Sequence, residues 1–275
     1  MEYHDILRTV RERAPLIQCI TNFVTVNDCA NILLAAGASP TMAQDIREVE
    51  DAVSGANGLV CNLGAIDLVD SMILAGKKAN ELGIPVVLDP VAAGGTALRR
   101  QLSAQLLEEV HFTSIRGNAS EIRALAGQMS RGSGVDASSF DTVTPENLSQ
   151  SVALIAALAR KTGAVIAVSG VIDVVSDGTQ TILLHNGCAA MARITGSGCM
   201  LTTLVGAFCA AVPEHPFAAT CAAMAAMGIC GELAEEKRLR NQTGNATFRN
   251  DLIDAVFNLS EQDLKERIRY EVYKG

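Results

Sequence analysis

The sequence predicts an α/β fold in which a mostly parallel sheet carries helices on both faces. Short apolar runs alternate with helical segments from residue 5 to residue 168. Runs such as 58–63 and 84–88 contain mostly apolar side chains, which is typical of parallel strands buried on both faces. The 275 residues are 49% hydrophobic and only 19% charged. A chain of this length and composition can bury a large core without disulfides or a structural metal, and it is not a disordered protein.

Local patterns predict the elements of this alternation in order. Helical spacing of apolar residues identifies the helices, and two of them end at Gly37 and Gly83, where the backbone can turn. The predicted helices span residues 5–13, 27–36, 68–82, 98–109, 120–126 and 145–161. Uninterrupted apolar runs between them predict strands at residues 16–20, 58–63, 84–88, 111–115 and 164–168.

The pattern changes after residue 170. Two apolar runs, 172–175 and 181–185, flank a polar turn at 176–179, so we expect a β-hairpin there. Beyond it the chain is largely helical, with mostly apolar stretches at 199–212 and 217–230. Each is shorter than the roughly 20 apolar residues of a membrane-spanning helix. We therefore expect two helices buried in the core or partly in a subunit interface.

No linker, repeat or low-complexity block interrupts the chain, so we expect one domain over residues 1–275. Residues 131–134 are expected to form the most mobile loop. The first 13 residues are charged and polar and contain no signal peptide, which favours a cytoplasmic location.

The composition excludes several classes of function. A net charge of −8 argues against a general binder of nucleic-acid backbones, and the chain has no Trp and only 4% aromatic residues to stack on bases. The eight cysteines and four histidines do not show the spacing of a zinc site. We interpret the cysteines as reduced, with seven of them packed as small hydrophobes and Cys199 as the exception.

The stretch 195–199 directly precedes an apolar helix and contains Gly196 and Gly198. Small residues let a ligand approach the backbone, and the first turn of a helix offers unpaired N–H groups and the positive end of the helix dipole. This combination predicts an anion site. Cys199 lies in the same turn, where a dipole can lower the pKa of a thiol. It could be a nucleophile, a weak base or a packed side chain, and taken alone the last is favoured.

Two carboxylates and one arginine follow predicted strands. Asp89 comes after the strand 84–88, while Arg116 and Glu121 follow the strand 111–115. Carboxylates at neighbouring strand ends suit Mg²⁺, and Arg116 suits a phosphate. The structural alternatives are a turn at Asp89-Pro90 and a capping box between Asn118 and Glu121. Together with the anion site, these residues are the parts that a phosphoryl transferase needs.

At this point the sequence resembles a known family, the hydroxyethylthiazole kinases, which are thiamine-pathway enzymes with the ribokinase-like fold. The resemblance runs over most of the chain, from residue 21 to residue 248. Its most specific pieces are Gly37-Ala38-Ser39-Pro40-Thr41-Met42-Ala43, Asp89-Pro90-Val91, Arg116-Gly117-Asn118-Ala119-Ser120-Glu121 and Thr195-Gly196-Ser197-Gly198-Cys199.

The resemblance implies a three-layer sandwich and phosphorylation of the hydroxyl of 4-methyl-5-(2-hydroxyethyl)thiazole by ATP with Mg²⁺. It also implies a homotrimer with thiazole pockets at subunit interfaces. The implied roles of residues follow from the matched motifs. Asn22, Met42 and Gly196 bind the thiazole, Arg116 and Ser169 contact ATP, Asp89 and Glu121 organise Mg²⁺, and Gly196, Ser197 and Gly198 form an anion hole.

Cys199 stands where most ribokinase-like enzymes have an aspartate base. A neutral thiol is a poor base, so positioning and charge stabilisation would supply most of the rate. Our hypothesis is that Cys199 orients the substrate hydroxyl and takes its proton late. A Cys199→Asp variant is then expected to keep or raise turnover, and complete loss of activity would contradict the hypothesis.

The sequence departs from the pattern of the family in three segments. The family commonly has Gly where Ala92 stands, and its usual Thr-Gly-Glu is Ser169-Gly170-Val171 here. The hydroxyl is kept, but the carboxylate at position 171 is lost, which could slow the enzyme or change its use of metal. Ser197 replaces a Thr and should be harmless.

Three alternatives remain open from the sequence. The first is a related kinase that acts on hydroxymethylpyrimidine, against which Cys199 and the Met42 segment argue. The second is a hydrolase or transferase with Cys199 as nucleophile, for which no histidine lies in a suitable segment. The third is a thiazole or thiamine-precursor sensor that has lost turnover, which the change at Val171 leaves possible.

Overall fold

A nine-stranded sheet forms the middle layer of the computed structural model, which describes residues 2–129 and 142–274. Its strands lie in the order β2-β1-β3-β4-β5-β6-β7-β8-β9. The strands are β1 (Leu16–Ile20), β2 (Ser39–Thr41), β3 (Gly58–Asn62), β4 (Val86–Asp89), β5 (Ser114–Asn118), β6 (Val165–Ser169), β7 (Asp173–Ser176), β8 (Thr181–Leu184) and β9 (Tyr270–Val272).

The prediction of a mostly parallel sheet is confirmed. All neighbours from β2 to β6 pair in parallel, and β7, β8 and β9 add an antiparallel edge. The predicted hairpin is the β7–β8 pair, closed by Ser176 opposite Thr181. Because the parallel strands all point the same way, their carboxyl ends meet along one edge of the sheet, where open α/β sheets bind ligands.

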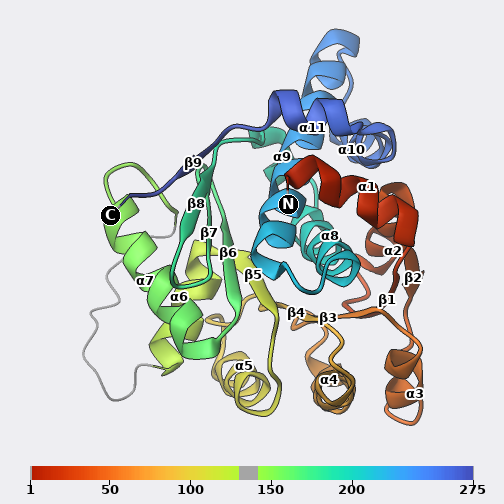
Figure 1. Ribbon diagram of the computed structural model, residues 1–275, viewed down its shortest axis with the longest axis vertical. Coiled ribbons are helices and arrows are strands. Elements are labelled where there is room, and N and C mark those ends of the chain that lie inside the picture. Colours follow the sequence, from red (N-terminus) through yellow and green to blue (C-terminus); the bar gives the residue numbers. More distant parts are fainter. Residues whose placement is uncertain (1, 130–141, 275) are drawn as a thin grey trace.

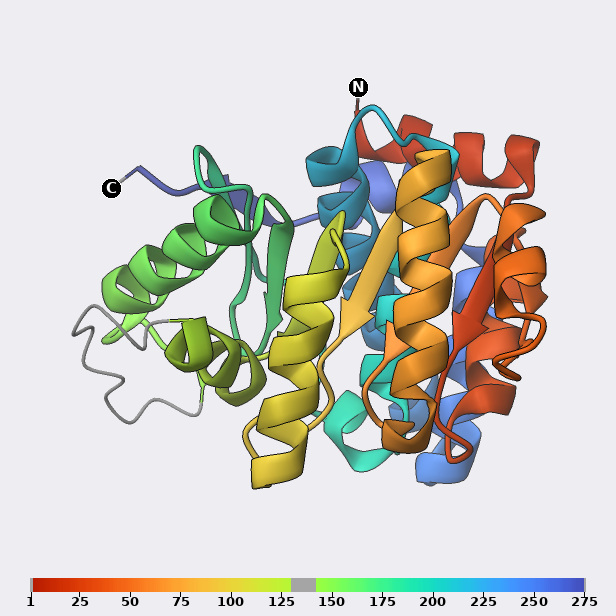
Figure 2. The same ribbon diagram turned by 90° about the horizontal axis from the view of Figure 1, so that it is seen from below.

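Helices cover both faces, as predicted (Figures 1 and 2). One face carries α1 (Tyr3–Arg13), α2 (Val26–Ala36), α8 (Ser197–Ala211), α9 (Pro216–Asn241), α10 (Asn245–Asn258) and α11 (Glu261–Arg267). The opposite face carries α3 (Val49–Ser54), α4 (Val69–Leu82), α5 (Ala97–Glu109), α6 (Ala119–Met129) and α7 (Leu148–Thr162). Each layer forms its own apolar core against the sheet, so the molecule is a three-layer sandwich.

The apolar stretches after Cys199 form helices α8 and α9, which pack against each other and the sheet. The second of these helices is longer than predicted, because it continues through charged residues to Asn241 instead of ending near residue 230. By length and composition α9 could cross a membrane, but 78% of its most apolar window is buried inside the protein. It is therefore a core helix.

Several element boundaries were wrong. The strand predicted at 111–115 is β5 at Ser114–Asn118, so Arg116 lies inside the strand, paired opposite Ala167 of β6. No sequence pattern predicted β2 and β9, because each strand has only three residues. The loop predicted at 131–134 lies outside the described residues. All eight cysteines are free thiols, and Cys188 and Cys199 are the two that are not fully buried.

The packing of α8 on the sheet generates a stability prediction. A Cβ on Gly206 of α8 would collide with Cγ2 of Val60 on β3, whose branched side chain cannot rotate away easily. We expect Gly206→Ala to lower the free energy of unfolding by about 1–3 kcal/mol. Gly127 of α6 has open space around the same position, so Gly127→Ala should raise stability by up to about 1 kcal/mol. Urea unfolding measures both, and equal effects of the two variants would contradict this packing.

Candidate active site

Polar side chains lie in a row along the carboxyl edge of the sheet. Asn22 follows β1, Asn62 ends β3 and Asp89 ends β4. The row continues with Arg116 on β5 and Ser169 at the end of β6. The strand order β1-β3-β4-β5-β6 therefore places these residues side by side in this sequence. Four of the five were predicted site residues, and Asn62 was not.

The start of α8 faces the middle of this row. Gly196 is the N-cap residue of the helix and has a left-handed backbone with φ +85°. A Cβ there would lie 2.9 Å from Cγ2 of Thr25, so both the conformation and the space require glycine. The next residues, Ser197 and Gly198, present first-turn N–H groups that have no partner within the helix. The three residues predicted to form an anion hole therefore lie at the start of a helix.

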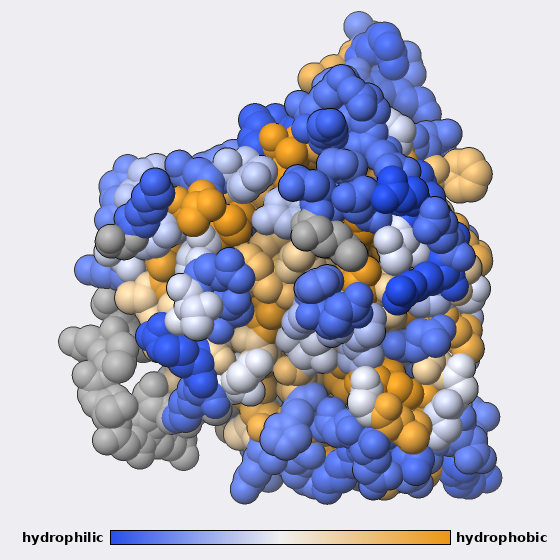
Figure 3. Space-filling view, viewed as in Figure 1, coloured by the Kyte–Doolittle hydropathy of each residue, from blue (hydrophilic) through white to orange (hydrophobic). Residues whose placement is uncertain are grey.

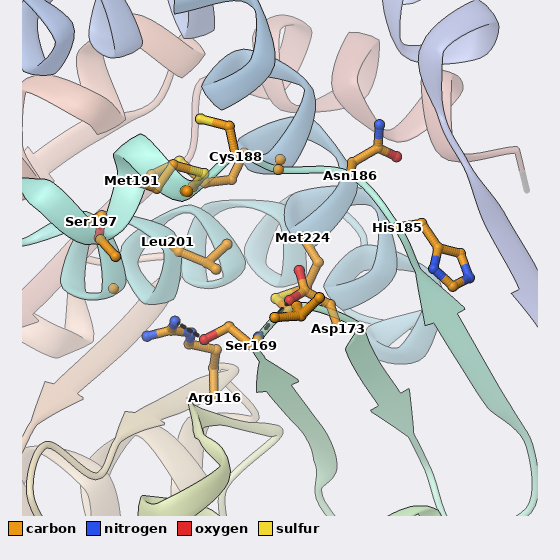
Figure 4. A pocket seen from close by; sticks show the side chains of 18 of the residues that line it. Arg116, Ser169, Asp173, His185, Asn186, Cys188, Met191, Ser197, Leu201 and Met224 are labelled. Atoms are coloured by element: carbon orange, nitrogen blue, oxygen red, sulfur yellow. Dashed lines mark hydrogen bonds between the residues drawn. The ribbon is translucent and has the colours of Figure 1, made fainter. Parts of the chain in front are cut away.

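Arg116 is brought directly against this helix start. Its side chain is buried, and its Nη2 donates a hydrogen bond to Oγ of Ser169 (Figure 4). A Cβ on Gly198 would lie 2.7 Å from Nη1 of Arg116, so the guanidinium touches the backbone of the first turn. A cation and several N–H donors therefore converge on one point, which is the arrangement that binds a phosphate.

A pocket of about 490 Å³ opens beside Arg116, between the ends of β5, β6 and β7 and the helices α8 and α9. Its polar end contains Arg116, Ser169 and the start of α8, and Figure 4 shows the side chains of Arg116 and Ser169 below this helix. The rest of its lining is largely apolar. The larger apolar side chains of the lining are Val171, Met191, Leu201, Met224 and Met227. A phosphate-binding end joined to an apolar slot suits a nucleotide.

On the other side of the α8 start lies a network of buried amides that the sequence analysis missed. Nδ2 of Asn62 donates to Oδ2 of Asp89 at 2.9 Å and to Sγ of Cys199 at 3.2 Å. Nδ2 of Asn22 donates to Oδ1 of Asn62 at 3.1 Å and to the same sulfur at 3.6 Å. Asn62 thus links the carboxylate to the thiol. Its sequence signal was the same as for Asp89, a polar residue closing an apolar strand.

The thiol of Cys199 is neutral at physiological pH. Burial, followed by the negative charge of Asp89, raises its pKa to about 12. The lowering that a helix start can produce is therefore outweighed by the loss of solvent. A thiol with this pKa is not an activated nucleophile, which argues against a cysteine hydrolase.

Asp89 and Glu121 form a pair of neighbouring carboxylates. The pKa of Asp89 is raised to about 6. Burial is the largest cause and the charge of Glu121 adds to it, while the charge of Arg116 acts in the opposite direction. The capping box is present, because the backbone N–H of Asn118 donates to Glu121 Oε2 at 2.8 Å and that of Glu121 to Asn118 Oδ1 at 2.9 Å. The other oxygen of Glu121 accepts from the N–H of Ala92 at 2.9 Å. Glu121 is thus held in place as a helix cap while its charge still acts on Asp89.

The charges of Asp89 and Glu121 fit a magnesium ion. Two carboxylates that repel each other at a partly desolvated site are stabilised by a nearby divalent cation, and Mg²⁺ commonly takes one or two carboxylates together with substrate phosphates and water. Among the described residues, no group of three or more His, Cys, Asp or Glu side chains is arranged to hold a metal without such a substrate.

Met42 and Asn22 lie at the β1–β2 end of the row. Met42 directly follows β2 and packs half-buried against the core of the α8 layer. The segment after it is tied to β1, because Nε2 of Gln44 donates to the carbonyl of Thr21 at 2.8 Å. The structure therefore brings Met42 to the same end of the sheet as Asn22.

The comparisons with known proteins decide the family. The model of the hydroxyethylthiazole kinase family matches residues 7–262. The chain belongs to this family. It is 49% identical over 269 residues to a hydroxyethylthiazole kinase of Clostridium acetobutylicum, covering 97% of this chain and 98% of the relative. The corresponding protein of Clostridium tetani is 47% identical, with 96% and 95% covered.

Solved structures agree with the fold. The hydroxyethylthiazole kinase protein of Pyrococcus horikoshii is 35% identical, with a TM-score of 0.87 and 99% of each chain covered. An ADP complex of Bacillus subtilis pyridoxal kinase is only 16% identical but reaches a TM-score of 0.57 over 78% of this chain and 90% of that one. The fold is therefore the ribokinase-like one that the resemblance implied.

Asp173 is a second buried carboxylate, missed because it begins a strand in an apolar run. It lines the pocket beside Ser169, and its Oδ1 accepts from the N–H of Gly170 at 2.8 Å (Figure 4). Burial raises its pKa to about 7, while the hydrogen bond from Gly170 and the charge of Arg116 lower it. The folded pKa lies above the unfolded value of 3.8, so the native state loses stability as the pH rises towards 7.

We therefore expect Asp173→Asn to stabilise the fold at pH 8 by about 2–4 kcal/mol and by less than about 1 kcal/mol at pH 4. The amide oxygen can still accept the hydrogen bond from Gly170, so the loop should keep its shape. Urea unfolding of both proteins at the two pH values measures the effect. A variant that is less stable than the wild type at pH 8 would show that the charged form is favoured here.

Proposed function

We propose that this protein transfers the γ-phosphate of ATP to the hydroxyl of 4-methyl-5-(2-hydroxyethyl)thiazole, giving the thiazole phosphate and ADP. Membership of the hydroxyethylthiazole kinase family supports the activity. One structural observation supports the mechanism most strongly: the first turn of α8, with Arg116 against Gly198, separates a nucleotide-sized pocket from the Asn22–Cys199 network.

The nucleotide is proposed to occupy the pocket on the β5–β7 side. Arg116 and the N–H groups of Ser197 and Gly198 would hold the phosphates. Ser169 keeps Arg116 in place through its hydroxyl, which is the function that the Ser at this position retains. Val171, where the family usually has Glu, is 77% exposed at the pocket rim. Because this position is exposed, having Val in place of Glu leaves the buried polar groups of the site intact. This supports an active enzyme rather than a sensor.

The thiazole alcohol is proposed to bind on the β1–β4 side, between Met42, Asn22 and Gly196. Its hydroxyl would then lie near Cys199 and the start of α8. The sulfur already accepts hydrogen bonds from the amides of Asn22 and Asn62, so it is poorly suited to take a proton early. Its role in this proposal is to orient the hydroxyl, whose proton leaves late in a loose transition state.

Positioning and electrostatics supply most of the rate in this mechanism. The first-turn N–H groups and Arg116 are fixed before the substrate arrives, so they stabilise the charge of the transferring phosphoryl group without reorganising. Asp89 and Glu121 are the residues proposed to hold Mg²⁺. When bound, the ion neutralises part of the phosphate charge.

We further propose a single-domain cytoplasmic protein that assembles as a homotrimer with the active sites at subunit interfaces. One sheet includes strands from residue 16 to residue 272, which supports one domain. Phe23 is 91% exposed and Val24 is 55% exposed directly beside Asn22, and Ile46 is exposed after the Met42 segment. Apolar side chains that surround a site in this way favour cover by another subunit.

The proposed activity is tested by release of ADP in the presence of the thiazole alcohol, with and without Mg²⁺. We expect ADP release that depends on both, and turnover with hydroxymethylpyrimidine at least about tenfold slower, because a pocket built for one heterocycle discriminates by this order. Faster turnover of the pyrimidine would overturn the substrate assignment. ATP binding without any turnover of the thiazole alcohol would indicate a sensor instead.

A further inference from the structure

The first two turns of α10 contact two segments that lie beside the proposed anion site. Asn245 and Arg249 are four residues apart and therefore share one face of this helix. Nδ2 of Asn245 donates to the carbonyl of Arg193 at 3.2 Å, three residues before Gly196. Nε of Arg249 donates to Oδ1 of Asp28 at 2.8 Å, and its Nη2 donates to the same oxygen. No part of the mechanism above uses these contacts.

Asp28 lies in the first turn of α2, beside the start of α8. Only 6% of its side chain is exposed, whereas that of Arg249 is 39% exposed. The position that a Cβ would take on Gly196 is 3.6 Å from Oδ2 of Asp28. A nearly buried carboxylate thus stands next to the N-cap of the helix that is proposed to receive phosphate.

This placement creates an electrostatic conflict. A carboxylate beside the start of α8 is attracted to the positive end of the helix dipole and cancels part of its field. It therefore repels an incoming phosphate, and burial strengthens the repulsion. The ion pair with Arg249 cancels the charge of Asp28. The hydrogen bond from Asn245 to the segment before Gly196 holds α10 beside the site.

We propose that Arg249 is a positioning residue for phosphoryl transfer, which neutralises Asp28 so that the start of α8 remains an anion site. The inference rests on the proposed phosphate site at Gly196–Gly198. Arg249 does not touch the substrate in this proposal. It acts through Asp28, and it explains why α10, far along the chain, contributes to the site.

The test is a double-mutant cycle with steady-state kinetics for ATP and the thiazole alcohol. Arg249→Gln leaves Asp28 uncompensated, and we expect kcat/KM for ATP to fall about tenfold or more, which corresponds to about 1.4 kcal/mol. Asp28→Asn in the same chain removes the charge, and the double variant should return to within about threefold of the wild type. Arg249→Lys keeps the charge and should also remain within about threefold.

Lys237→Gln is the matched control. Lys237 is 43% exposed and pairs at 2.5 Å with Asp251, which is 5% exposed, on α9 and α10. Its loss should lower the melting temperature as much as Arg249→Gln does, without changing kcat/KM for ATP. A kinetic loss of the same size in Lys237→Gln would overturn the proposal, because the effect would then come from general destabilisation.

The proposal is also overturned if Arg249→Gln stays within about twofold of the wild type, or if Asp28→Asn fails to restore it. Titration calorimetry of the same variants with ATP and Mg²⁺ measures the affinity of the site independently of turnover. A wild type that binds ATP but does not phosphorylate the thiazole alcohol would refute the proposed function, while the binding cycle would still decide the role of Arg249.

Discussion

The contact between the first turn of α8 and the guanidinium of Arg116 is the constraint on which the site depends. It exists because Gly198 has no side chain, and because Gly196 supplies a left-handed backbone that turns the chain into the helix beside Thr25. A larger residue at either position would separate the helix dipole from the cation. Since both α8 and β5 are fixed by apolar cores, the partial positive charge of the helix start and the full charge of Arg116 are held together before any phosphate binds.

The buried polar groups around this contact lower the stability of the fold but provide the charged groups of the site. Asp89 and Asp173 both have raised pKa values because they are removed from water close to the site. Ala92 adopts φ +55°, where the family commonly has Gly, while its N–H holds Glu121. Such strained and desolvated residues are typical of functional sites, and they persist because the surrounding apolar layers are large.

Physical patterns in the sequence predict the fold and part of the candidate site, whereas Asn22, Met42 and Ser169 were named only through the family resemblance. Asp89 was found because it is a polar residue that closes a buried strand, and Arg116 because a charged residue directly follows the apolar run ending at residue 115, although it lies inside β5. Asn62 gives the same signal as Asp89, but an amide alone suggests no reaction, so its link between Asp89 and Cys199 needed coordinates. The pair of Asp28 and Arg249 spans 221 residues, and no local pattern predicts a contact across that distance. The three-residue strands β2 and β9 are likewise too short for periodicity to detect.

The most direct test of this account is calorimetric binding of ATP with Mg²⁺ to Gly198→Ala. The added methyl group meets only the flexible end of Arg116, so the fold should survive while the guanidinium is displaced. Ser197→Thr, which introduces the residue common in the family, is the control and should bind like the wild type. We expect the affinity of Gly198→Ala to fall about tenfold or more at unchanged melting temperature. Wild-type affinity in Gly198→Ala would contradict the claim that the contact between α8 and Arg116 forms the phosphate site.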